Sequence, residues 1–209
     1  MKNSLVARFR SVLFVVSAGF LGAGCSTLPE QGEILTESYV DIERFMGDWY
    51  VIASIPTFLE KDIYNATETY RLDDDGTIDT TFAFRKGSFE GKQKSYNPRG
   101  FIRDTQSNAE WGMRFVWPIK SDYRIVYVDD AYSQTIIGRN KRDFAWIMAR
   151  TPSIPNDDLV AQVRLLKEQG YDIDKLQVVP QRWDGQQSAY DLSSVVSPDA
   201  GASAEVAAL

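Results

Sequence analysis

The chain has 209 residues, of which 44% are hydrophobic and 25% charged, so it fits one globular domain with additional segments at its ends. Its net charge of −6 argues against nucleic-acid binding, because no basic stripe is present to neutralise phosphates. The sequence contains no histidine, which excludes Ser-His-Asp and Cys-His catalysis and removes the commonest metal ligand.

The first 24 residues have the pattern of an export signal. Lys2, Arg8 and Arg10 precede an apolar run from Val12 to about Leu21. This run is too short to span a bilayer well, and the basic residues before it favour a signal peptide over a buried N-terminal helix. We therefore expect residues 1–24 to be removed from the mature protein.

Cys25 is the only cysteine, so no internal disulfide can stabilise the domain. The residues before it, Leu21-Gly22-Ala23-Gly24, resemble the cleavage box of bacterial lipoproteins, although that pattern prefers leucine at the place of Gly22. The resemblance implies that Cys25 becomes the first mature residue and carries acyl chains such as palmitate. Ser26 after the cysteine implies sorting to the outer membrane, where several acyl chains anchor a protein stably. Residues 25–37 are expected to form a polar tether.

Residues 38–183 are expected to form the folded domain. Short alternating runs separated by turn residues are typical of an antiparallel barrel or sandwich. Asp73-Asp74-Asp75-Gly76 marks one hairpin turn. Eight strands are predicted, in chain order Trp49–Ser54, Ala66–Leu72, Thr77–Arg85, a strand containing Phe101, Trp111–Trp117, Tyr123–Val128, Thr135–Gly138 and Phe144–Arg150.

After Pro152 the spacing of the apolar residues changes from the alternation of a strand to the spacing of a helix. An apolar stripe at positions i, i+4 and i+7 predicts an amphipathic helix, with Asn156 as its N-cap and Gly170 as its stop. The stripe consists of Leu159, Val163 and Leu166.

The last part of the chain is expected to contribute little regular structure. Gln177-Val178-Val179 can add a short strand beside the first predicted strand. Residues 184–209 are rich in Ser, Ala, Gly and Gln and are expected to form a disordered tail.

Alternation with period two assigns one face of each strand to the interior. If Trp49 points inward, Val51 and Ala53 do so too, and parity selects a mostly aromatic set elsewhere. Each single residue is more readily explained as core filler, but the set as a whole predicts an apolar cavity. With Phe58 in the first long loop, the residues expected to contact a ligand are Glu68, Tyr70, Phe82, Phe84, Met113, Phe115, Tyr123, Ile125, Tyr127, Phe144 and Trp146.

Glu68 is the exception in this apolar set. Desolvation disfavours the ionised form of a carboxyl group that faces an apolar cavity. Either the parity is wrong at this position, or Glu68 meets a partner or the head group of a ligand.

Three motifs carry a resemblance to the lipocalin family. Gly47-Asp48-Trp49-Tyr50 resembles its Gly-x-Trp-Tyr signature, and Trp146–Pro152 resembles its last-strand motif, which ends in Arg150. Between them, Tyr127–Tyr132 lies where the family has a Thr-Asp-Tyr-like turn, with valine in place of the threonine. Alone, Trp49 could be a core residue and Arg150 a surface charge. Together, in order over residues 38–183, the motifs most resemble those of the bacterial outer-membrane lipocalins.

The resemblance implies an all-β fold with one helix. This is an eight-stranded antiparallel up-and-down β-barrel with a C-terminal α-helix packed on its wall. It also implies that Arg150 packs over Trp49 and, with Gly47, forms the floor of the barrel. A guanidinium group stacked on an indole contributes roughly 0.5–2 kcal/mol. Relatives can pair, so a homodimer is possible.

Three functions remain open at this level. The first is a membrane-anchored binding protein without cofactor or catalysis, which holds a fatty acid, lysophospholipid or similar molecule and, as the resemblance implies, serves envelope lipid transport, storage or repair. The second is a simple enzyme with Glu68 and Tyr70 as acid and base. The third is an envelope scaffold with a filled barrel. No metal is expected, since Asp73–Asp75 lacks the alternating ligands and distal glutamate of a calcium loop, and acidic residues such as Asp129-Asp130 are common in turns.

Overall fold

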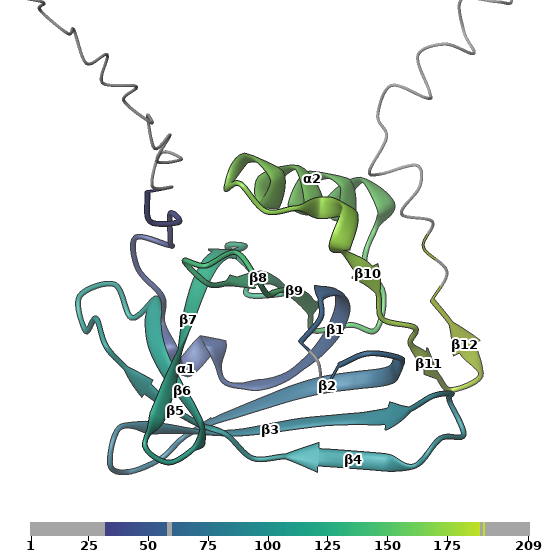
Figure 1. The fold of residues 1–209 in the computed structure, drawn as a ribbon, viewed down its shortest axis with the longest axis horizontal. Helices are drawn as coiled ribbons and strands as arrows, with labels where there is room; N and C mark the ends of the chain where they lie inside the picture. The colour runs from purple at the N-terminus through teal and green to yellow at the C-terminus, as the bar shows by residue number, and fades with distance from the viewer. Residues whose placement is uncertain (1–31, 58–59, 189, 191–209) are drawn as a thin grey trace, which may run out of the picture. The chain divides into compact units, whose positions relative to one another are not determined.

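The computed structural model describes residues 32–57, 60–188 and 190. The chain divides into the units Met1–Gly32 and Glu33–Leu209, and the fold belongs to the second of them (Figure 1). The strands that form the barrel are β1 (Gly47–Ile55), β2 (Ile63–Leu72), β3 (Thr77–Lys86), β4 (Gln93–Tyr96), β5 (Arg99–Ile102), β6 (Glu110–Val116), β7 (Ile119–Val128), β8 (Gln134–Gly138) and β9 (Ala145–Ala149).

The sheet closes on itself. β1 pairs with β2 on one side and with β9 on the other, and all pairings are antiparallel. β4 and β5 both pair with β3 and share the fourth position of the barrel. Between them lies Pro98, whose carbonyl accepts a hydrogen bond from the Thr80 backbone N–H at 3.2 Å. The predicted eight-stranded up-and-down barrel is thus confirmed.

Helix α2 (Asn156–Glu168) packs on the barrel wall over β8 and β9 (Figure 1). Its predicted apolar stripe is buried there against side chains such as Ile52 and Ile147, in what we call the outer cluster. The predicted cap is wrong by one residue, because Pro155 occupies the N-cap position and Asn156 is already helical. Gly170 ends the helix with φ +85°, a conformation that glycine adopts without strain. The buried stripe consists of Leu159, Val163 and Leu166.

The C-terminal segment is ordered further than predicted. A short 3₁₀ helix (Ile173–Lys175) leads to β10 (Gln177–Val178), which pairs with β1 as expected. The strands β11 (Arg182–Trp183) and β12 (Gln186–Gln187) then form a hairpin. The prediction of a disordered tail from residue 184 onward is therefore wrong for β12. Residues 191–209 lie outside the described part of the chain.

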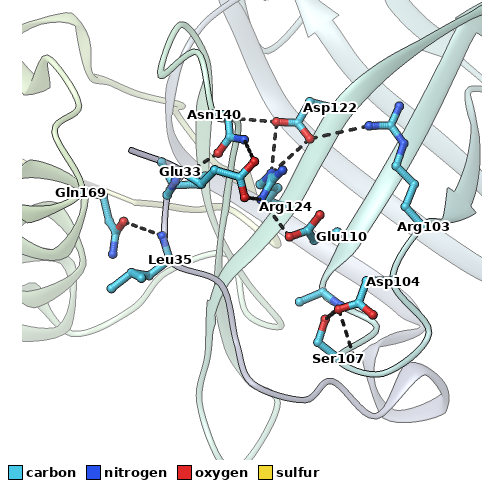
Figure 2. Close-up of polar contacts among 12 residues, drawn as sticks. Glu33, Leu35, Arg103, Asp104, Ser107, Glu110, Asp122, Arg124, Asn140 and Gln169 are labelled. Carbon is cyan, nitrogen blue, oxygen red and sulfur yellow. Dashed lines mark hydrogen bonds and ion pairs between the residues drawn. The ribbon is translucent and has the colours of Figure 1, made fainter. Parts of the chain in front are cut away.

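The folded domain also begins earlier than predicted. The side chain of Ile34 is buried in the outer cluster, and its backbone N–H donates to Asn140 Oδ1 at 3.0 Å. The Leu35 N–H donates to Gln169 Oε1 at 2.9 Å (Figure 2). The backbone of Glu37 bonds to a carbonyl of β7 at 3.0 Å. Residues 33–37 of the predicted tether therefore lie against the barrel.

Arg124 of β7 fastens this segment (Figure 2). Its guanidinium group is buried and lies 2.8 Å from Glu110, 3.2 Å from Asp122 and 3.6 Å from Glu33. A buried cation is tolerated only when it is paired, and here three carboxylates surround it. The ion pairs join β6, β7 and the N-terminal segment.

Two β-bulges change which face some residues occupy. The register shifts between Val51 and Ala53 in β1, and between Ile125 and Tyr127 in β7. One extra residue in a strand reverses the alternation beyond it. Ala53 and Tyr127 therefore pack with the outer cluster under α2, and their predicted inward orientation is wrong.

The short helix α1 (Ile42–Phe45) closes one end of the barrel, which we call the floor. Phe45 is fully buried and packs on Trp49 with a centroid distance of 5.1 Å. The Trp49 indole N–H donates to the Phe45 carbonyl at 2.9 Å. The Arg150 guanidinium lies 3.7 Å from the Trp49 ring centroid. Gly47 has φ +97°, and a Cβ atom there would stand 3.3 Å from Arg150, so a side chain would strain the floor.

Candidate functional site

The barrel encloses a cavity of about 310 Å³, open at the end opposite the floor. Eight of the residues predicted to contact a ligand line it, and they come from β2, β3, β6, β7, β9 and the turn before β9. Phe115, at the rim, is 56% exposed. The eight are Glu68, Tyr70, Phe82, Met113, Phe115, Tyr123, Phe144 and Trp146.

The remaining predicted contacts lie elsewhere. Phe84 and Ile125 are buried in the inner core but do not line the cavity. Tyr127 faces outward because of the β7 bulge and lines a groove beside α2, so its assignment to the cavity is wrong. Phe58 lies outside the described residues.

Several lining residues were not among the predicted ligand contacts. Thr57 and Glu60 belong to the loop between β1 and β2, where no period exists to assign a face. In β8, alternation does not decide between Ile136 and Ile137 as the inward residue, because both are apolar. The lining residues not predicted as ligand contacts are Thr57, Glu60, Tyr96, Pro98, Val116, Ser121, Asp122, Ile137, Arg139 and Met148.

Glu60 folds back from the loop over the cavity wall. Its Oε2 accepts hydrogen bonds from the Trp146 indole N–H and from the Thr57 backbone N–H, both at 3.1 Å. Burial raises the pKa of Glu60, and these hydrogen bonds oppose the rise only in part. The loop is thereby attached to β9 across the rim.

Glu68 points into the cavity, so the parity that assigned it inward was correct. It lies opposite Trp49 on one neighbouring strand and Phe82 on the other. Its Oε2 atom is buried and has no hydrogen-bond partner among the described residues. Burial, and secondly the charge of Glu60, raise the pKa of Glu68 well above its usual range. What remains accessible of the side chain belongs to the cavity and not to the outer surface.

Two tyrosines form a polar pair near Glu68. The hydroxyls of Tyr70 and Tyr123 share a hydrogen bond of 2.6 Å. Burial raises the pKa of each phenol well above its usual range, and the charge of Glu68 adds to the rise. Both hydroxyls are therefore neutral at physiological pH.

Arg139 supplies the single cation among the described lining residues. Its guanidinium carbon lies 5.0 Å from the Phe144 ring centroid, and Nη1 lies 3.5 Å from Asp143. The Nε atom is buried without a hydrogen-bond partner. The cavity lining thus has one basic residue, at the turn between β8 and β9, and three acidic residues, Glu60, Glu68 and Asp122. Of the three, Asp122 is paired with Arg124.

Glu68→Gln is expected to stabilise the protein at neutral and higher pH. In the unfolded chain a glutamate ionises near its ordinary pKa of 4.5, whereas the folded state holds the proton to higher pH. The folded state is therefore penalised progressively as the pH rises above 4.5, and the penalty is absent below it. Thermal melts should show a melting temperature several degrees above wild type at about pH 8 and no difference at about pH 4. Equal melting temperatures at both pH values would contradict the buried position of the carboxyl group.

Within the described part of the chain, no group of three or more His, Cys, Asp or Glu residues is placed to hold a metal ion. No described helix is long and apolar enough to cross a membrane.

Comparison with known proteins identifies the family. The family model of the lipocalin-like domain matches residues 40–181. Temperature-induced lipocalin-1 of Arabidopsis thaliana is 31% identical and aligns over 74% of this chain and 86% of its own length. Outer membrane lipoprotein Blc of Citrobacter freundii is 29% identical, over 81% of this chain and 95% of its own length.

Solved structures agree in fold. Insecticyanin from the tobacco hornworm Manduca sexta aligns with a TM-score of 0.56 at 13% identity, over 78% of this chain and 88% of its own. The cockroach allergen Per a 4 aligns with a TM-score of 0.54 at 18% identity, over 73% of this chain and 96% of its own. The family model matches residues 40–181, and the closed barrel with its open cavity has the fold expected of that family. The chain therefore belongs to the lipocalin family.

Proposed function

We propose that this protein binds a small hydrophobic ligand, such as a fatty acid, a lysophospholipid or a similar amphiphile, and stores or transports it in the barrel. The cavity carries this proposal, because it is preformed, open at one end and lined mainly by aromatic and aliphatic side chains. Transfer of a tail from water into such a cavity gains about 0.8 kcal/mol for each buried CH₂ group. An open cavity of about 310 Å³ also favours a carrier over a scaffold with a filled barrel.

The cavity chemistry favours binding over conversion of the ligand. An acid–base pair needs one group that accepts a proton at working pH. The hydroxyls of Tyr70 and Tyr123 bond to each other, and burial raises the pKa of both phenols, so neither supplies that group. Glu68 Oε2 has no hydrogen-bond partner among the described residues that would orient it for proton transfer. We therefore propose no catalytic role for Glu68 and Tyr70.

Blocking the cavity tests the binding function. Ser121 of β7 lines the cavity near its open end, and it is only partly buried, so a larger side chain can be accommodated there. Ser121→Trp is expected to fill the entrance and weaken binding of an environment-sensitive apolar probe by about tenfold or more. The matched control is Ser95→Trp, since Ser95 is exposed on β4 and does not line the cavity. Equal affinity of both variants and wild type would contradict binding inside the barrel.

We propose that the protein is anchored to the bacterial outer membrane through acylated Cys25. The lipoprotein-like cleavage box supports this, as does the similarity to proteins named outer membrane lipoprotein Blc. Glu33, the first residue of the folded unit, supports it further, because it bonds to Asn140, the neighbour of the cavity-lining Arg139, and so lies near the open end. Exposed apolar side chains mark the same end, as expected for a rim that takes its ligand from lipid. They are Phe115, Val116, Trp117 and Ile119 of the β6–β7 turn.

Cys25→Ala is expected to move the protein from the membrane fraction to the soluble fraction. Acyl chains supply the membrane affinity of an anchored lipoprotein, and without them no stable anchor remains. Fractionation of cells followed by immunoblotting measures the change, with Thr27→Ala as the control that stays with the membrane. A Cys25→Ala variant that remains in the membrane fraction would contradict the anchor. The pairing of two copies stays a prediction.

A further inference from the structure

Two carboxyl groups face the same apolar cavity without a cation bound to either of them. Glu68 lies on β2 in the cavity wall, and Glu60 reaches the cavity from the loop between β1 and β2. They are close enough for the charge of Glu60 to act on Glu68. The ion pairs among the described residues involve neither of them, and Arg139 interacts with Asp143 instead. The cavity thus contains acidic groups that the protein itself does not neutralise.

The unpaired atom is Glu68 Oε2. It is buried, has no hydrogen-bond partner among the described residues and belongs to a side chain that points into the cavity. Nearly all buried polar atoms in proteins have a partner, so an exception of this kind calls for an explanation. A ligand group that bonds to Glu68 would supply the missing partner.

An anionic head group does not fit this place. A carboxylate or phosphate beside Glu60 and Glu68 would meet like charge in a medium of low dielectric constant. A neutral hydroxyl would satisfy the hydrogen bond but would leave the charge of an ionised Glu68 uncompensated. An amino group fits both forms, because an ammonium donates to the carboxylate and a neutral amine accepts from the carboxylic acid.

The surrounding walls favour a cation as well. Aromatic rings attract a cation to their faces, and the attraction grows when water is excluded. The lining contains no lysine among the described residues, and its one arginine lies at the turn before β9, beside Phe144. The aromatic lining residues are Tyr70, Phe82, Tyr96, Phe115, Tyr123, Phe144 and Trp146.

We propose that the cavity is selective for apolar molecules that carry an amino group, which bonds to Glu68 with Glu60 as the second acidic neighbour. This inference rests on the proposed function, since it names the class of ligand that the same cavity holds. It makes Glu68 the residue that determines head-group specificity, while the aromatic walls hold the tail.

The test compares three ligands with the same tail and different heads. Dodecylamine and dodecanoate, each below its critical micelle concentration, and dodecanol, below its solubility limit, compete with the apolar probe for the full-length protein. We expect dodecylamine to bind about tenfold or more tightly than either of the other two. In Glu68→Gln the ratio of amine to alcohol affinity should fall to about one, whereas Glu43→Gln, in which an exposed glutamate of α1 is changed, should keep the wild-type ratio.

The outcomes separate this inference from the function on which it rests. If the three ligands bind equally, or if dodecanoate binds best, the cavity binds apolar ligands but the amine specificity is wrong, and tight binding of dodecanoate would direct attention to Arg139. An amine preference that persists in Glu68→Gln also overturns the role of Glu68. If none of the three displaces the probe, binding of apolar ligands fails and the specificity fails with it. Thermal melts of both variants verify that each is folded.

Discussion

Arg150→Ala is expected to lower the free energy of unfolding by about 3–4 kcal/mol, because several charged hydrogen bonds in the floor are lost together. Nη2 donates to three consecutive carbonyls at 2.8–3.1 Å, and Nη1 and Nε donate to two further carbonyls at 2.8 and 3.2 Å. The guanidinium also covers the Trp49 ring. The carbonyls belong to Arg44, Phe45, Met46, Asp48 and Tyr132.

Chemical denaturation measures this loss, and two variants serve as its controls. Arg150→Lys keeps the charge but has a compact ammonium that cannot reach all five carbonyls, so its stability should lie between wild type and alanine. Arg71→Ala removes an arginine whose side chain is 70% exposed and whose ion pairs are at the surface, so it should cost at most about 1 kcal/mol. If Arg150→Ala were no more destabilising than Arg71→Ala, the floor assignment would be wrong.

Gln181→Leu is expected to lower the free energy of unfolding by about 2–4 kcal/mol, because two buried carbonyls lose their donor. Gln181 is 1% exposed, and its Nε2 donates to the carbonyls of Val51 at 2.8 Å and Ala66 at 3.0 Å. β1 and β2 pair only as far as Tyr50 and Thr67, and the amide of Gln181 connects the two strands beyond that point. Leucine has a similar size but offers no donor.

The matched control is Gln187→Leu, which makes the same exchange at an exposed position of β12. It should leave the midpoint of urea denaturation within experimental error of wild type. A Gln181→Leu variant as stable as Gln187→Leu would show that the hydrogen bonds from the C-terminal segment do not support the barrel.

The repetitive part of the fold could be predicted from the sequence. Strands with regular alternation placed Glu68, Tyr70, Phe82 and Met113 in the cavity lining, because period two holds as long as the strand pairs without interruption. Glycine and acidic residues predicted the turn at Asp73–Gly76. In the structure the chain reverses there between β2 and β3, and the Asp73 backbone N–H donates to the Thr77 carbonyl.

The bulges could not be predicted, because an extra residue in one strand depends on the partner strand. Val126 and Tyr127 both turn toward α2, and nothing in their own run of residues distinguishes Tyr127 from Tyr123. The outward face of Tyr127 follows from how β7 pairs with β8.

Contacts between distant segments were missed for a different reason. Glu60 lies in a loop, and it joins the cavity by bonding to Trp146, 86 residues away. Gln181 reaches carbonyls that are 130 and 115 residues away in sequence. A polar residue in an irregular segment has no period that assigns it to the interior, so its burial becomes evident only once the barrel is closed.

Native mass spectrometry of the mature protein, purified gently from the membranes of the cells that make it, tests the central claim most directly. Beyond the mass of the protein with its covalent acyl chains, we expect a population with the added mass of a noncovalently bound apolar amphiphile, and that population should disappear in Ser121→Trp but persist in Ser95→Trp. Only the mass of the protein itself, together with no uptake of added fatty acid, lysolipid or alkylamine, would contradict a lipocalin that carries a ligand in its barrel.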